Sequence, residues 1–222
     1  MRTDAIIKED VLNELDWEPS IDATKVGVTC VNGVVTLSGY VNTFTEKLAA
    51  ERAAKRVFGV RAVVEEIEVK IGGVYKRTDQ DIAQAALNNL RWRTNVPDKD
   101  ISLKVENAWI TLEGTVEWNF QKDAAKNAIK DLAGVRGVTN IIRVKSAVEP
   151  SNIKDKIKKA FERNATLDAD HVNVRVDGHK VILSGSIQSM AEKKQAEEAA
   201  WAAPGVTEVV DNLEIQIKET AF

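Results

Sequence analysis

The sequence predicts an α+β protein of three tandem α-β-β-α-β modules, each a three-stranded mixed sheet with two helices on one face. Three observations predict this architecture. A short apolar strand ending in glycine occurs three times, a Gly-Val pair follows each of these glycines at a constant distance, and the hydrophobic period changes in the same order in every copy. We therefore expect three small cores rather than one large one.

The repeat is anchored by a strand at residues 35–39, 110–114 and 181–185, which reads Val-Thr-Leu-Ser-Gly, Ile-Thr-Leu-Glu-Gly and Val-Ile-Leu-Ser-Gly. In each copy the glycine of a Gly-Val pair lies 20 residues later, at Gly59, Gly134 and Gly205. The copies are displaced by 75 and then 71 residues, so each is one small domain. We place the domains at residues 1–72, 77–147 and 149–218.

Each copy begins with a helix and continues with a hairpin. Ile7, Val11 and Leu15 have the spacing of a helix with one buried stripe, and equivalent apolar residues recur in the other copies. The alternation of apolar residues over 26–30 predicts a half-buried strand. Hairpin turns that need positive φ are predicted at Asn32-Gly33 and Asp177-Gly178, and less ideally at Asn107-Ala108.

A second helix and a last strand complete each copy. The helices are expected at about residues 45–57, 121–132 and 190–202, where alanine permits close packing on a sheet. The last strand follows that helix, so it should pair in parallel with the second strand through a right-handed crossover. Both helices then cover one sheet face and the other face is left open.

Composition gives little direction about partners. The chain has 31 basic and 34 acidic residues, a net charge of -3, and this balance gives no drive toward nucleic acid. No signal peptide is visible at the N-terminus, and charged residues interrupt every apolar segment that could form a transmembrane span. We expect a cytoplasmic protein; the alternative is a periplasmic protein whose signal has been removed.

The pattern resembles the BON domain. The resemblance rests on the initial Ile/Leu helix, on Asn-Gly-Val-Val-Thr-Leu-Ser-Gly at residues 32–39, on the alanine-rich helix, and on Gly-Val-x-x-Val at 59–63. The second copy departs from it by placing Ala108 at the turn glycine. The resemblance covers almost the whole chain. It implies a phospholipid-binding or membrane-surface module associated with envelope stress, without family-wide catalytic residues; osmotically inducible periplasmic proteins and outer-membrane lipoproteins belong to the family.

Residues that could carry catalysis do not recur in the copies. His171 and His179 occur only in the third copy, so the repeat does not depend on a metal, and we assign no metal or cofactor. Ser38 and Ser184 are replaced by Glu113 in the second copy, and Cys30 falls on an inward strand position as a packed thiol. We therefore expect a protein that is not an enzyme.

The tryptophans depart from the repeat and mark the candidate binding residues. Trp92 lies between Arg91 and Arg93, Trp109 replaces Val34 and Lys180 on an outward strand position, and Trp118 replaces Thr43 and Ser189 before the second helix. Residues 76–147 contain 12 basic and 9 acidic side chains, a balance of +3. The candidate lipid-binding or partner-binding residues are Arg91, Trp92, Arg93, Trp109 and Trp118.

Two functions fit these residues. Guanidinium groups pair with phosphate and indoles settle at headgroup level, which favours a stress-related adaptor that binds anionic phospholipid at a membrane surface. The alternative is a soluble scaffold that binds an unidentified protein. Equally, the tryptophans could seal contacts between modules, and we expect Trp201 to cover a neighbouring module. An enzyme would require a pocket between modules with convergent titratable groups.

Overall fold

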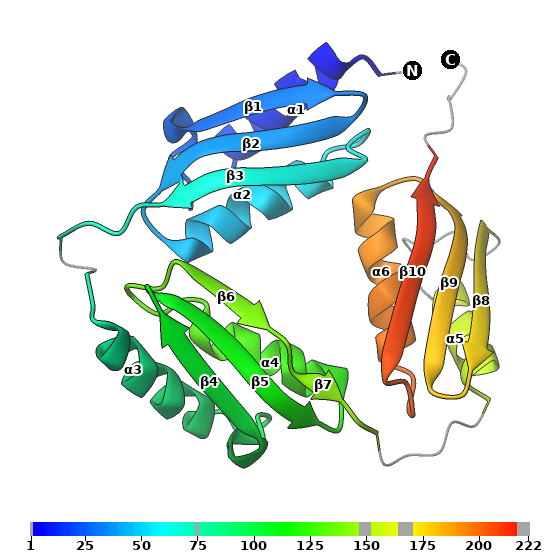
Figure 1. Cartoon of the computed structure of the whole chain (residues 1–222). Coiled ribbons are helices and arrows are strands. Elements are labelled where there is room, and N and C mark those ends of the chain that lie inside the picture. The colour runs from blue at the N-terminus through cyan, green and yellow to red at the C-terminus, as the bar shows by residue number, and fades with distance from the viewer. Residues whose placement is uncertain (1, 74–75, 147–151, 164–170, 217–222) are drawn as a thin grey trace.

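The computed structural model describes residues 2–73, 76–146, 152–163 and 171–216, and it confirms the predicted fold class. Three modules follow one another along the chain, each with its own sheet and its own helix pair (Figure 1). In all three, the second strand is central, pairing antiparallel with the first strand and parallel with the last. Both helices of a module cover the same sheet face, and the outer face is open.

The elements of the first module are α1 (Asp4–Asp16), β1 (Val26–Val31), β2 (Val34–Val41), α2 (Phe44–Arg56) and β3 (Ala62–Val69). The second has α3 (Asp79–Trp92), β4 (Ile101–Glu106), β5 (Trp109–Val116), α4 (Asn119–Ile129), β6 (Gly137–Asn140) and β7 (Arg143–Val144). The third has α5 (Ile153–Glu162), β8 (Val172–Asp177), β9 (Lys180–Ile187), α6 (Met190–Trp201) and β10 (Glu208–Ile215). Short 3-10 turns precede β1 and β4.

The last strand of the second module is interrupted, whereas its sequence predicted one strand. The Asn140 carboxamide oxygen accepts from the backbone N–H of Ile142, and its amide nitrogen donates to the Lys122 carbonyl on α4. The register with β5 is the same on both sides of the interruption, since Asn140 pairs with Leu112 and Arg143 with Thr115, and the Ile141 N–H still donates to the Leu112 carbonyl. In the third module the Leu213 N–H makes the same bond to the Asp211 carboxylate inside the unbroken strand β10, so this bond does not explain the interruption.

An aspartate at the start of helix one fixes the hairpin in two modules. Asp4 accepts hydrogen bonds from the backbone N–H groups of Asn32 and Gly33, and these bonds hold the pKa of its carboxyl below the usual range. Asp79 makes the same pair of bonds to Asn107 and Ala108. Ala108 has a φ of 64°, a strained value for a residue with a side chain, so the aspartate stabilises a turn that its sequence alone disfavours.

The third hairpin turn lies one residue later than predicted. Asp177 pairs with Lys180 as the last residue of β8, so the turn residues are Gly178 and His179 rather than Asp177 and Gly178. Only Gly178 has positive φ, at 55°, as a two-residue turn with glycine in its first position requires. The prediction was wrong here because Asp-Gly is a strong turn signal, but the strand register excludes Asp177 from the turn.

The glycine in the middle of each hairpin's second strand is required by a close backbone approach. Gly39, Gly114 and Gly185 have φ values of 112°, 137° and 121°. A Cβ at any of them would lie 2.1 Å from a carbonyl oxygen at the start of the neighbouring strand. We expected each strand to end at its glycine, but the glycines lie inside β2, β5 and β9. Their role is to let two strands approach where no side chain fits.

The second helices of the three modules face one another. α2 contacts α6, and α4 lies between the second sheet and the third module (Figure 1). Phe44, at the start of α2, is buried in the hydrophobic core of the second module, and Leu48 packs beside it. Thr45 donates a hydrogen bond of 3.0 Å to the Asp131 carboxylate. The first two modules therefore share part of one hydrophobic core and are not joined by a linker alone.

Replacing Gly185 with alanine is expected to destabilise the third module by about 3 kcal/mol or more, because the new Cβ meets a carbonyl oxygen and the φ value is strained. Urea unfolding followed by circular dichroism measures this change. The matched control is Gly72→Ala, where nothing lies within 4 Å of the new Cβ and a change within about 0.5 kcal/mol is expected. Equal effects of the two substitutions would contradict the close approach.

Replacing Phe44 with alanine is expected to cost about 3 kcal/mol and to loosen the first module from the second, because Phe44 belongs to the core of its neighbour. Limited proteolysis should then cut the connection between these modules faster than in the parent chain. Phe120→Ala removes the same ring from a site that is 56% exposed, so about 1 kcal/mol or less is expected. An unchanged proteolysis rate for the Phe44 variant would refute the shared core.

Candidate functional site

The most exposed aromatic side chain of the second module lies between two arginines. Trp92 is the last residue of α3, and its side chain is 85% exposed. The buried stripe of α3 ends at Leu90; a residue two positions further along a helix is turned by about 200°, so Trp92 points to solvent. Arg91 and Arg93 on either side are also exposed. We name Arg91, Trp92 and Arg93 the basic corner.

The first module presents an equivalent tryptophan in an acidic setting. Trp17 follows α1 and is 84% exposed, but its neighbours are Asp16 and Glu18. A hydrogen bond from Ser20 is the main cause that lowers the pKa of Glu18, with Arg56 adding to it, so Glu18 remains ionised at neutral pH. The two tryptophans are therefore alike in exposure and opposite in the charge beside them.

Trp109 is part of the outer face of the sheet. Its indole Nε1 donates a 2.8 Å hydrogen bond to Thr139, and its ring lies over Gly137, where any Cβ would come within 2.4 Å of it. The side chain is 46% exposed, as expected for an outward strand position. The glycine leaves room for the indole to lie against β6, so Trp109 packs on the sheet and offers one ring face to solvent.

The structure does not bring Trp109 together with the basic corner. Asp79 at the start of α3 bonds to the turn next to Trp109, whereas Trp92 ends the same helix. The helix is 14 residues long, and at 1.5 Å per residue its ends are about 20 Å apart. A single patch containing Trp109, Trp92 and the two arginines is therefore not formed.

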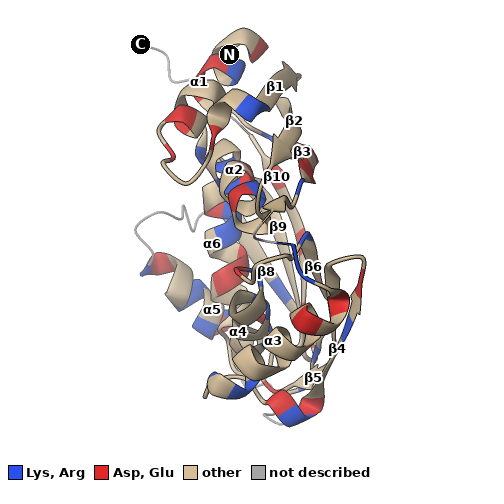
Figure 2. Cartoon of the chain, turned by 90° about the vertical axis from the view of Figure 1, so that its left-hand side faces the viewer, with Lys and Arg blue, Asp and Glu red and all other residues tan. Residues whose placement is uncertain are grey.

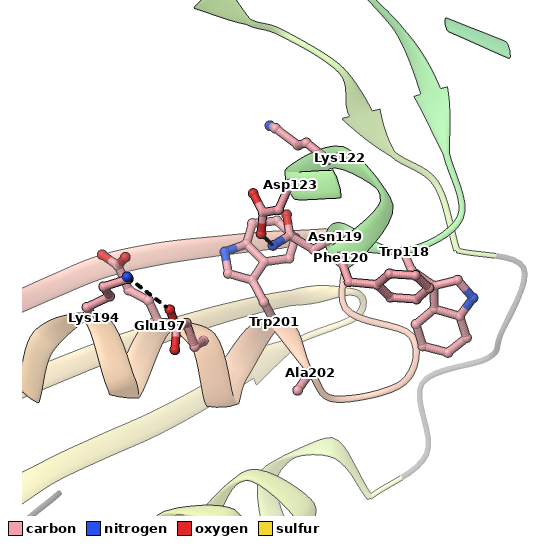
Figure 3. A pocket seen from close by; sticks show the side chains of 10 residues that line it. Trp118, Asn119, Phe120, Lys122, Asp123, Lys194, Glu197, Trp201 and Ala202 are labelled. Carbon is pink, nitrogen blue, oxygen red and sulfur yellow. Dashed lines mark hydrogen bonds and ion pairs between the residues drawn. The ribbon is translucent and has the colours of Figure 1, made fainter. Parts of the chain in front are cut away.

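Trp118 lies in a different place again, in a groove between the second and third modules. The groove has a volume of about 570 Å³ and is lined by the start of α4 and the end of α6. Trp118 and Phe120 lie on one side, and Trp201 extends from α6 toward Asn119 and Asp123 (Figure 3). Trp201 packs against the core of its own module and also lines the groove that faces the second module, so it meets our expectation only in part. At the corresponding place in the first interface, Phe44 fills the space that Asn119 leaves open.

Charged groups of both signs line the remainder of this groove. Burial raises the pKa of Asp123, although Lys122 and Lys126 act in the opposite direction. Lys194 and Glu198 form an ion pair of 3.5 Å on α6. Such a mixed surface suits a contact between modules as well as a ligand, and the groove has no surplus of positive charge for an anion.

Phe120 is the groove residue that our sequence analysis missed. It is half-exposed at a position where the other modules have Thr45 and Ala191. The comparison between copies that singled out the tryptophans would also have found it. Its exposure could not be inferred, because an aromatic residue in the first turn of a helix is usually part of a core.

Polar residues elsewhere have structural partners. His179 Nδ1 lies 2.6 Å from the carbonyl oxygen of Gly205, which joins the third hairpin turn to the loop after α6. Burial is the main cause that raises the pKa of the Cys30 thiol, with the nearby Asp4 carboxylate adding to it. Among the described residues no group of three His, Cys, Asp or Glu side chains is placed to hold a metal ion. No helix in this part of the chain could cross a membrane.

A curated relative is osmotically-inducible protein Y of Escherichia coli K12, 31% identical over 127 residues. The match covers 54% of the chain and 63% of the relative, so it extends over less than two thirds of that protein. The relative is a periplasmic protein, which contradicts the cytoplasmic location that we expected. That expectation was wrong because it depended on the absence of a visible signal peptide.

Two solved structures of CdsD, a structural protein of the type III secretion system of Chlamydia trachomatis, also align with the chain. They are 16% and 14% identical, with TM-scores of 0.27 and 0.26, and cover 98% and 97% of the chain and 94% and 99% of the CdsD chains. These scores are too low for any argument about function. The BON domain family matches residues 3–71, 78–146 and 150–217, one match for each module, and the chain therefore belongs to the BON domain family.

Proposed function

We propose that this chain is a non-catalytic protein that binds anionic phospholipid at a membrane surface through the basic corner of its second module. The observation that carries the proposal is the nearly complete exposure of Trp92 between two exposed arginines. An indole that is almost fully exposed to water has no role in the core of its own module. It is suited to a surface that is apolar and anionic at once.

The chemistry of the corner matches the headgroup region of a bilayer. Guanidinium groups form bidentate hydrogen bonds with phosphate, and an indole settles where phosphate meets the acyl chains. Each arginine near an anionic leaflet contributes about 1 kcal/mol, and an inserted tryptophan about 1–3 kcal/mol. The total corresponds to weak, reversible binding by one chain.

Family membership and the osmotically inducible relative support a stress-related setting for this binding, and the relative's compartment supports the periplasm. A second candidate function is a scaffold for another protein. The groove lined by Trp118, Phe120 and Trp201 favours it, because Phe120 is more than half exposed there. The two functions differ in whether vesicles are bound at all.

Replacing Trp92 with alanine is expected to weaken binding to vesicles of phosphatidylglycerol and phosphatidylcholine by about 10-fold, since the inserted indole is lost. Co-sedimentation measures the bound fraction. Trp17→Ala is the matched control, because it removes an equally exposed indole whose neighbours are acidic, and binding should not change. Equal losses in both variants, or no binding by the parent chain, would sink the proposal in favour of the scaffold.

Replacing Arg91 and Arg93 together with glutamine is expected to weaken binding to the same vesicles by about 30-fold, from about 1 kcal/mol for each charge. The parent chain should also lose affinity as salt is raised, and the double variant should lose less. Vesicles of phosphatidylcholine alone provide the control, on which the substitutions should have no effect. Binding that ignores both salt and the double substitution would argue against anionic lipid as the ligand.

A further inference from the structure

The outer edge of the first module differs from the equivalent edges of the other two. β1 is an edge strand, hydrogen-bonded only to β2, and it reads Val-Gly-Val-Thr-Cys-Val without a charge or a proline. The equivalent strands are β4, which carries Lys104 and Glu106, and β8, which carries Arg175 and Asp177. Charges on an edge strand protect it from pairing with another chain, so two modules have this protection and the first lacks it.

The row of outward side chains at the hairpin end of β1 is also uncharged. At the hairpin end of the outer face, Val31 lies opposite Val34, and Val34 lies opposite Ala62. Val31 is 63% exposed, the largest exposure of any valine, leucine or isoleucine in the described part of the protein. In the third module the same row is Asp177, Lys180 and Glu208, with an ion pair between the last two. In Figure 2 the arrowhead at the end of β1 is tan, the colour of uncharged residues.

The backbone of β1 determines what kind of partner this edge can accept. In a hairpin with a two-residue turn, the N–H and C=O groups of Val31, Thr29 and Gly27 point to β2. Those of Val26, Val28 and Cys30 therefore point outward, away from the sheet. A partner that satisfies three alternate residues in a row must itself be an extended strand.

We propose that β1 pairs antiparallel with β1 of a second copy of this chain, about a two-fold axis at Val28. In this register Val28 lies opposite its own copy and Val26 lies opposite Cys30, so the outward groups of both strands meet. About six backbone hydrogen bonds form across the axis, and the two sheets become one six-stranded sheet. The contact is isologous, since each copy supplies the same strand.

The charge pattern of the other strands favours this occupant. Pairing of an uncharged strand costs the least desolvation free energy when its partner also brings no charge into the contact. Of the remaining edge strands, β3 carries three glutamates and β10 carries two glutamates and an aspartate. β4 and β8 carry charges of both signs, and β6 has only four residues before the ladder is interrupted. Within this chain, β1 is the strand whose chemistry matches β1.

The test uses substitutions that sister modules already contain. Thr29→Lys gives β1 the lysine that β4 carries at Lys104, so the fold accepts it. In the proposed register Thr29 lies diagonally across the two-fold axis from Thr29 of the second copy, so the substitution brings two lysines together. Sedimentation velocity at about 10–100 µM chain should show the parent chain at twice the 24.5 kDa of one copy. The Thr29→Lys variant should sediment as a monomer with an unchanged circular dichroism spectrum.

A second variant separates edge pairing from stacking of the two open faces. Val34→Lys places on the central strand β2 the lysine that the third module has at Lys180. It charges the outer face without touching the edge, so the dimer should persist. Dissociation of the Val34 variant would assign the contact to the face and overturn the proposal. A parent chain that is monomeric throughout the concentration range would overturn it as well.

Discussion

The close approach at the glycine of each hairpin is the constraint on which each module depends. With no Cβ at Gly39, the chain passes within contact of the Lys25 carbonyl, and this fixes the pairing of Val26 with Gly39. A shift of one residue would turn every side chain of the strand to the opposite face. The register therefore decides that Val35 and Leu37 face the helices while the neighbouring residues form the outer surface. The same constraint, repeated at Gly114, turns Trp109 outward.

Since the framework is repeated, the differences between copies show where the modules have separate tasks. Thr43 and Ser189 cap their helices with a side-chain oxygen, but Trp118 at the same position cannot. Giving up such a cap costs about 1 kcal/mol, partly offset by the Gln121 side chain, which accepts from the backbone N–H of Trp118. A tryptophan that weakens its own helix is explained by the groove that it lines. A charged residue is replaced by an aromatic one in the same way, since the position of Lys55 on α2 is occupied by Trp201 on α6.

The repeat made the fold of each module predictable, but it could not predict the contacts between modules. The alternation over β1 and the stripe of Ile7, Val11 and Leu15 predicted the elements because burial follows a local period. Phe44 carries no such signal, because the sequence predicts that a phenylalanine at the start of a helix packs in the core of its own module. That the second module buries it follows only from the tertiary structure. Trp92 and Trp109 do not form one site for a similar reason: Trp92 is at the end of α3, whereas Trp109 lies next to the turn that Asp79, at the start of α3, binds. Only the three-dimensional path of the helix separates them.

The proposed membrane contact and the proposed strand pairing are independent, but their energies complement each other. One basic corner, with about 2 kcal/mol from its arginines and about 1–3 kcal/mol from its indole, reaches only millimolar affinity. A dimer through β1 carries two such corners, and when the first is bound the second acts at an effective concentration in the millimolar range, provided that both can reach one surface. Trp17 does not supply an equivalent corner, since its neighbours Asp16 and Glu18 are acidic and the nearby Arg56 is already paired with Glu14 and Glu18. An assembly of two weak sites would respond steeply to the density of anionic lipid, whereas a single corner would respond in proportion to it.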